Sequence, residues 1–291
     1  MLPYVWMVFG ALAFAVMSEL AYALGPKCDW QLVAIARTGI AMLCAAALTV
    51  SGGARLVYFR PRVLWMRSIA GSVSLVCGFY ALTHLPVADV LALTNMFPLW
   101  VAVLSWPLLG EPPPWLVWPA SACGILGVLL IQQPHTADGN LASLVALFAS
   151  FTSAIALIGL HRLQGLDSRA IVAHFSAVSL VFSIGALFLF DHSTSPLASV
   201  DAEVALLMLG VGVTATIGQI LLTKAFSAAH PAKVSVVALS QVGFGILLDV
   251  LLWHRTFNGL TILGILLILL PTAGVLISRE ARQESEQRTE L

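Results

Sequence analysis

The chain has 291 residues, of which 59% are hydrophobic and only 10% are charged. Soluble globular proteins carry about 25% charged residues, so this composition is typical of an integral membrane protein. The 14 basic and 14 acidic residues cancel, which excludes the strong overall field that would attract nucleic acid or an acidic partner. The 4 cysteines are scattered and form no CxxC or Cys/His pattern, so neither a disulfide framework nor a zinc site is expected.

Apolar runs long enough to cross a bilayer follow one another along almost the whole chain. A spanning helix needs about 20 mostly apolar residues, and about ten such runs are separated by short polar or Pro/Gly breaks. The predicted fold class is therefore an all-α polytopic membrane protein with about ten transmembrane helices. The runs cover residues 4–24, 31–51, 65–84, 87–109, 114–133, 140–160, 169–190, 203–224, 233–253 and 259–278.

The basic residues gather on one side of these predicted spans. If the N-terminus lies inside, the outside receives only Lys27 and Arg255. Since Lys and Arg in short loops stay in the cytoplasm, we expect a multi-pass protein of the inner (cytoplasmic) membrane with both termini cytoplasmic. The predicted cytoplasmic residues are Arg55, Arg60, Arg62, Arg67, Arg162, Arg169, Lys224, Lys233, Arg279, Arg282 and Arg288.

The sequence contains a weak internal repeat. A shift of 144 positions places residues 88–111 on residues 232–255 without a gap, and a Gly-bearing apolar run follows each segment. We therefore expect a first five-helix repeat in 1–134, a second in 135–278 and a charged cytoplasmic tail in 279–291. Because five is odd, the second repeat enters the membrane from the opposite side. Such inverted repeats are typical of transporters that alternate access to a shared midplane site.

The segment FYALTHLPVADVLALTNMFPLWVAVLSWPLLGE, together with the Arg of ARTGIAMLCAA, resembles the EamA family of the drug/metabolite transporter superfamily. The similarity covers essentially the whole chain and is most specific at residues 85–89, at Pro98 and at Gly110-Glu111. It implies helices in two inverted halves around a central cavity, and transport of small organic metabolites. In the second half, Val242 and Arg255 stand where the family usually has proline and glutamate.

Polar side chains near the centres of the apolar runs are candidates for a substrate cavity. Proline in the middle of 87–109 frees a backbone carbonyl to which a substrate can hydrogen-bond. Small and polar faces of neighbouring helices would complete a wet cavity, although any one of these faces alone is more typical of close helix packing. The predicted cavity residues are Tyr80, Asn95, Pro98, Gln219, Ser240 and Gln241.

Charged or titratable side chains inside the apolar runs are costly unless they are paired or wet. Glu19 and Arg37 lie at a matched depth, about 8–9 Å inside the outer surface. Either they form an ion pair between neighbouring helices, or Glu19 binds a proton or a cationic group while Arg37 meets a carboxylate. His174 can titrate near neutral pH and is a further candidate. Glu111, at a cytoplasmic helix end, is expected to be structural.

These features favour a secondary transporter that moves a small organic metabolite by alternating access. The substrate class would be an amino acid, an amine, a carboxylate or a related compound. The chain contains no HExxH, GxSxG or GxxxxGK[ST] motif, so no catalytic site, metal or cofactor is expected. A polytopic enzyme acting on a lipid-linked substrate and a non-transporting membrane subunit are the alternatives. The expected partners are the lipid bilayer and a small-molecule substrate, and no nucleic acid is expected. The sequence leaves open whether the protein forms a homodimer.

Overall fold

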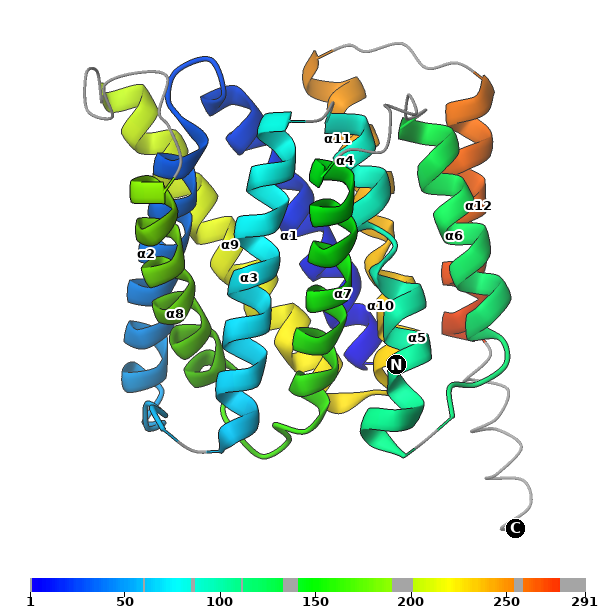
Figure 1. Ribbon diagram of the computed structural model, residues 1–291, viewed down its shortest axis with the longest axis horizontal. Coiled ribbons are helices and arrows are strands. Elements are labelled where there is room, and N and C mark those ends of the chain that lie inside the picture. Colours follow the sequence, from blue (N-terminus) through cyan, green and yellow to red (C-terminus); the bar gives the residue numbers. More distant parts are fainter. Residues whose placement is uncertain are drawn as a thin grey trace.

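The computed structural model describes residues 2–59, 61–84, 87–110, 112–132, 141–189, 201–253 and 259–277. This part of the chain is mostly helical, and no strand is found within it (Figure 1). The helices are α1 (Leu2–Leu24), α2 (Trp30–Ser51), α3 (Arg62–His84), α4 (Val87–Thr94), α5 (Phe97–Leu109), α6 (Val117–Gln132), α7 (Leu141–His161), α8 (Ser168–Leu189), α9 (Ala202–Ala228), α10 (Pro231–Ala238), α11 (Ser240–Trp253) and α12 (Gly259–Ile277).

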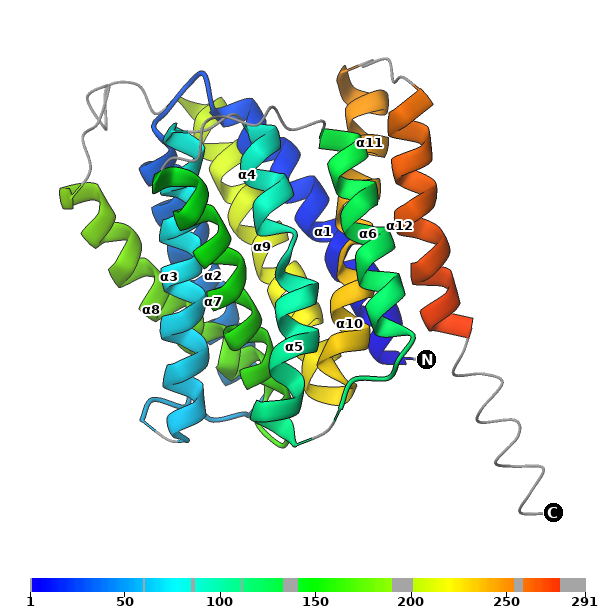
Figure 2. The ribbon, with the colours of Figure 1, turned by 45° about the vertical axis from the view of Figure 1, so that its right-hand side comes forward.

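The helices run side by side between two ends of the molecule (Figures 1 and 2). Among the described residues, 7 segments are long and apolar enough to cross a membrane, and Val117–Leu130 and Ile262–Pro271 are shorter apolar helices. An all-helical, multi-pass membrane protein is therefore confirmed. The longer segments are Leu2–Leu24, Trp30–Ser51, Val90–Leu109, Leu141–His161, Ser168–Leu189, Ala202–Ala228 and Pro231–Leu252.

The helix boundaries follow the predicted apolar runs within a few residues, with one difference of substance. The runs 87–109 and 233–253 were each expected to be a single helix, and that expectation is wrong. The first is divided into α4 and α5, and the second lies in α10 and α11. In Figure 1, α4 and α11 lie in the upper half of the molecule and α5 and α10 in the lower half. Each interruption therefore falls near mid-height, where a spanning helix would be deepest in the bilayer.

The core is built from helices that come from opposite halves of the chain. The most extensive interfaces pair α1 with α9, α3 with α7, α2 with α8 and α6 with α12. Small residues bring these helices close together. For example, a Cβ atom added at Gly127 of α6 would lie 2.6 Å from the carbonyl oxygen of Gly264 in α12. The two halves thus interdigitate rather than forming separate domains.

Candidate functional site

The first interrupted helix breaks at Asn95 and Met96. Proline has no N–H group, so Pro98 in the first turn of α5 leaves the carbonyl of Thr94 without its usual helical donor. The side chain of Asn95 turns back, and its Nδ2 donates to the carbonyl oxygen of Leu91 over 2.8 Å. Pro98 is buried and Asn95 is half-buried. The amide therefore ends α4, and the proline begins α5.

The second interrupted helix breaks at Leu239, without a proline between residues 232 and 253. The N–H of Leu239 donates to the carbonyl of Val236 over 3.2 Å, and the N–H of Val242 donates to the carbonyl of Leu239 over 3.0 Å. Such tighter i to i−3 bonds replace the regular helical ladder at the break. Ser240 begins α11, is buried, and its hydroxyl has no hydrogen-bond partner among the described residues.

The two interruptions lie close together. Leu239 packs in one cluster with Val128 of α6 and Ile268 of α12, and Phe97, the first residue of α5, packs against that cluster. The helices α5 and α10 are also in contact. Leu239 reaches so far toward α6 that its Cδ1 occupies the place where a side chain at Gly124 would begin. Residues about 140 positions apart thus form one junction at mid-height.

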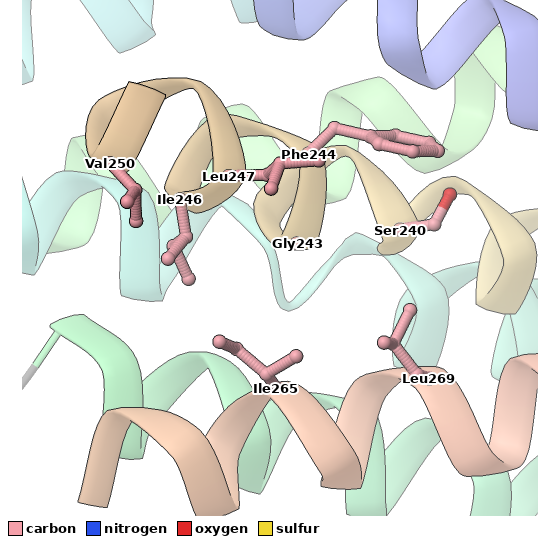
Figure 3. A pocket seen from close by; sticks show the side chains of 8 residues that line it. All are labelled: Ser240, Gly243, Phe244, Ile246, Leu247, Val250, Ile265 and Leu269. Carbon is pink, nitrogen blue, oxygen red and sulfur yellow. The ribbon is translucent and has the colours of Figure 1, made fainter. Parts of the chain in front are cut away.

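A cavity of about 280 Å³ opens beside the second interruption, between α11 and α12 (Figure 3). Figure 3 shows Ile265 and Leu269 of α12 facing side chains of α11 across this space. Its lining is apolar except for Ser240, so it differs from the wet cavity expected around this residue. It is lined by Ser240, Gly243, Phe244, Ile246, Leu247, Val250, Ile265 and Leu269.

A buried polar junction joins α3, α8 and α9 in the lower half of the molecule. Arg67 of α3 is only 3% exposed. Its Nη2 donates to Oε1 of Gln219 in α9 over 3.2 Å, and its guanidinium carbon lies 3.7 Å from the ring centre of Phe175 in α8. The sequence counted Arg67 among the basic residues of the cytoplasmic side. The structure places it inside α3 as an interior residue that engages the predicted cavity residue Gln219.

His174 lies beside this junction and has partners on both ring nitrogens. Nε2 lies 3.1 Å from the carbonyl oxygen of Tyr58, which can only accept, so Nε2 carries the proton. Nδ1 therefore accepts from the hydroxyl of Ser68 over 2.8 Å in the neutral ring. Trp65 stacks edge-on against the imidazole at 4.8 Å. This geometry accounts for His174 as a hydrogen-bonded packing residue between α3 and α8.

Other polar side chains join neighbouring helices. The hydroxyls of Ser72 and Ser179 lie 2.8 Å apart, and those of Ser74 and Ser153 lie 2.6 Å apart. These pairs link α3 to α8 and to α7, as expected where small polar residues hold membrane helices together. Tyr80, a predicted cavity residue, packs against a buried cluster of α3, α4 and α7.

Two charged candidates lie near the upper end of the molecule. Arg37 is half-buried in α2, and no ion pair links it to an acidic residue in the described part of the chain. Glu19 is half-buried in α1. A separate ion pair joins Lys27, after α1, to Glu203 at the start of α9, with 2.5 Å between Nζ and Oε1. Gln241 is half-buried at the start of α11, and Glu111 lies outside the described residues.

A polar clamp ties α2 to α8 at the lower end. Arg169 donates from Nη2 and Nε to the carboxylate of Asp167, over 2.7 and 3.0 Å, and from Nη1 to the carbonyl of Leu48 over 2.9 Å. These hydrogen bonds from Arg169 hold the pKa of the Asp167 carboxyl below its ordinary value. Asp167 lies in the turn between α7 and α8, outside the spanning helices.

Sequence reasoning missed two elements of this arrangement, Arg67 and Leu239. The position of Arg67 five residues inside an α-helix, without an acidic residue nearby in sequence, could have marked it as an interior cation. No signal in the sequence singles out Leu239, because it is one leucine in a long apolar run. Its role depends on the glycine that faces it from another helix.

Comparison with known proteins agrees with this architecture. The EamA-like transporter family matches residues 1–133 and 140–277. The pseudopaline exporter CntI of Pseudomonas aeruginosa is 28% identical over 263 residues, which cover 90% of this chain and 91% of the exporter. The riboflavin transporter of Vibrio cholerae is 24% identical over 273 residues, which cover 92% of this chain and 90% of that transporter.

A crystal structure of a protein with 19% sequence identity superposes with a TM-score of 0.81, over 94% of this chain and 97% of that chain. At this identity the likeness shows the shared fold alone. The family match extends over nearly all of the sequence, and the relatives named above are an exporter and a transporter. The protein is therefore not an enzyme but a transporter-type membrane protein, and it belongs to the EamA-like transporter family.

Proposed function

We propose that the chain is a secondary transporter that moves a small organic metabolite by alternating access of two inverted repeats, residues 1–134 and 135–278. The substrate class is an amino acid, an amine, a carboxylate or a related compound. In this proposal α4 with α5 and α10 with α11 each make one crossing, so the chain crosses the membrane about ten times. The membrane is the inner membrane, and both termini are cytoplasmic.

The pattern of helix contacts supports the inverted repeat. Exchange of the two repeats would replace α1 by α7, α2 by α8, α3 by α9 and α6 by α12. The α1–α9 interface then becomes the α7–α3 interface, and both are among the most extensive in the protein. The α2–α8 and α6–α12 interfaces each map onto themselves. Such a contact pattern is expected of two similar units related by a two-fold axis.

The observation that carries the proposal is the meeting of two interrupted helices at mid-height. Interrupted helices in transporters expose backbone groups where the substrate binds. Here α5 packs on α10, whereas α4 packs on α3, α6 and α7, and α11 packs on α1 and α12. The lower halves of the two broken helices are therefore in contact. Separation of α5 from α10 together with approach of α4 to α11 would move access from one end to the other.

Proton coupling is assigned to Glu19 in this proposal, since a half-buried carboxyl can exchange a proton between the two access states. Asn95, Pro98, Gln219, Ser240 and Gln241 form the proposed substrate region, with Tyr80 at its upper edge. A homodimer remains compatible with the proposal, because transport by alternating access requires a single chain only.

The test is solute flux in proteoliposomes that contain the purified protein. Labelled amino acids, amines and carboxylates are offered with and without a pH gradient. The proposal predicts saturable uptake above that of empty liposomes for at least one class, with dependence on the pH gradient that Glu19→Gln removes. Absence of uptake of every compound under every gradient would contradict the proposed transport. Uptake with unchanged pH dependence in Glu19→Gln would contradict the coupling role alone.

A further inference from the structure

We infer that Arg67 is the binding point for an anionic group of carboxylate type on the transported solute. This inference rests on the transport function proposed above and narrows its substrate class. The anion would bind between α3 and α9, where the guanidinium of Arg67 meets the amide of Gln219. It would be held by the charge and by the unused N–H groups of the arginine.

The burial of Arg67 is the first observation. The side chain begins five residues inside α3, about 7–8 Å from the helix start at 1.5 Å per residue, and the residue is only 3% exposed. A guanidinium offers five N–H donors. One of them, on Nη2, reaches Gln219, and Nε has no hydrogen-bond partner among the described residues. The group therefore retains unused donors in a buried place.

The second observation is that the partners of this cation are neutral. Gln219 contributes an amide oxygen, and Phe175 contributes the face of its ring. Asp167, the acidic residue of the nearby turn, is bound to Arg169. In the part of the chain that the structure describes, no ion pair of Arg67 is found. Burial of a cation costs several kcal/mol without a counter-charge, so an anion would be strongly attracted.

The surrounding helices leave room for the arginine and hold it in place. A Cβ atom at Gly71 of α3 would lie 3.0 Å from Nη1 of Arg67, and a Cβ atom at Gly159 of α7 would lie 3.3 Å from the Cβ of Arg67. Any larger side chain at these positions would crowd the group. The hydrogen bond to Gln219 and the ring of Phe175 hold the guanidinium in this space before an anion arrives, which lowers the entropy cost of binding.

A further polar group lies on the same face of α9. Thr223 follows Gln219 by four residues, so the two side chains project one helical turn apart. The hydroxyl of Thr223 is fully buried and has no hydrogen-bond partner among the described residues. A carboxylate can accept from a guanidinium and from a hydroxyl at once. The junction therefore offers a cation and an unused hydroxyl, both buried.

The position of Arg67 favours a transported anion over a fixed structural ion. Arg67 belongs to the first repeat, and its contacts Phe175 and Gln219 belong to the second. A ligand at this place bridges the two halves that must move relative to each other. Its affinity would then differ between the two access states, as transport requires.

The experiment measures thermal unfolding of the purified full chain in detergent while succinate, citrate or L-glutamate is titrated. Succinamide serves as the uncharged analogue of succinate. We expect at least one carboxylate to stabilise the protein at a concentration at least tenfold below that of succinamide. Arg67→Gln should remove this preference, and Arg67→Lys should weaken it at least tenfold, because lysine lacks the planar fork. Arg62→Gln, an exposed arginine of the same helix, should leave it unchanged.

A second variant covers the case in which Arg67→Gln does not fold. Gln219→Glu would place a carboxylate next to Arg67 within the chain itself. We expect this variant to be more heat-stable than the native protein and no longer stabilised by the added carboxylates. An unchanged response to carboxylates in Gln219→Glu or in Arg67→Gln would overturn the inference. Failure of all three carboxylates to stabilise the native protein would overturn it as well.

Flux through proteoliposomes from the same preparation separates this inference from the proposed function. Transport that shows no preference for carboxylates and that persists in Arg67→Gln would contradict the anion site. The proposed transport function would stand in that case. Carboxylate binding that depends on Arg67, without flux of any compound, would contradict the transporter but leave the site. Carboxylate flux that is lost in Arg67→Gln and retained in Arg62→Gln would support both.

Discussion

In the first interrupted helix, Asn95 and Pro98 lie at the break, whereas the second helix breaks at Leu239 with no proline nearby. Pro98 favours the first break through its own covalent structure, because it lacks an N–H group and leaves the carbonyl of Thr94 without its helical donor. The second break depends on other helices. Leu239 is 1% exposed and packs against Val128 and Ile268.

An interrupted helix is thus specified by a local residue in the first half of the chain and by packing against other helices in the second half. A break specified by a local residue should persist when side chains of the neighbouring helices are shortened. A break held by packing should instead be sensitive to the size of the side chains in its socket, formed by Gly124, Val128 and Ile268.

The largest effect is expected from Leu239→Ala. Removal of a fully buried leucine leaves a cavity and typically costs about 2–5 kcal/mol of unfolding free energy. The measurement is unfolding of the purified protein in mixed SDS and non-ionic micelles, followed by circular dichroism. Leu251→Ala provides the control, because Leu251 is 61% exposed in the same broken helix. Equal losses in the two variants would contradict the socket.

Gly124→Ala tests the opposite side of that socket. The new methyl group would collide with Cδ1 of Leu239, and overpacking of this kind costs about 1–3 kcal/mol. At Gly185 of α8, by contrast, an added Cβ meets no atom within 4 Å, so Gly185→Ala should be neutral or stabilising through its helix propensity. The same unfolding assay measures both variants. A higher unfolding free energy for Gly124→Ala than for the native protein would contradict the close packing of Leu239 against Gly124.

Asn95→Ala addresses the locally specified break. The variant loses the hydrogen bond from Nδ2 to the carbonyl of Leu91, a change worth about 0.5–1.5 kcal/mol. Because Pro98 still favours the interruption, α4 and α5 should stay separate, and the loss should be smaller than that of Leu239→Ala. Thr94→Val is the matched control, as it removes a hydroxyl bonded within α4. A loss as large as that of Leu239→Ala would show that the first break also depends on one side chain.

Asp167→Asn provides a reference far from both breaks and should have the smallest effect, because solvent screens this partly exposed ion pair. The pKa of Asp167 is lowered in the folded protein. Its contribution to stability is therefore present at neutral pH and is lost as the pH falls through that lowered pKa. Melting temperatures measured from neutral to acidic pH should converge for the native protein and Asp167→Asn at the acid end. A difference that grows on acidification would contradict this sign.

Much of the fold could be predicted because it depends on apolar length. The helix boundaries follow runs of about 20 apolar residues. The first interruption was not predicted, although Asn95 and Pro98 near the middle of run 87–109 are a local signal for it. The second interruption and the packing of Leu239 beside Gly124 could not be predicted in the same way. Each of these depends on which helices become neighbours, and the apolar runs carry little information about partner choice.

The central claim is that the junction of α5 and α10 opens and closes during transport. Ala102 of α5 is fully buried and Ala238 of α10 is 8% exposed, and both belong to the main buried cluster. Each is changed to cysteine in a variant without the four native cysteines and treated with a membrane-impermeant thiol reagent in oriented vesicles. We predict labelling from the cytoplasmic side only, at a rate that changes severalfold with the solute found in the flux assay. Labelling that is absent from both sides under all conditions, or that is unaffected by that solute, would contradict the claim.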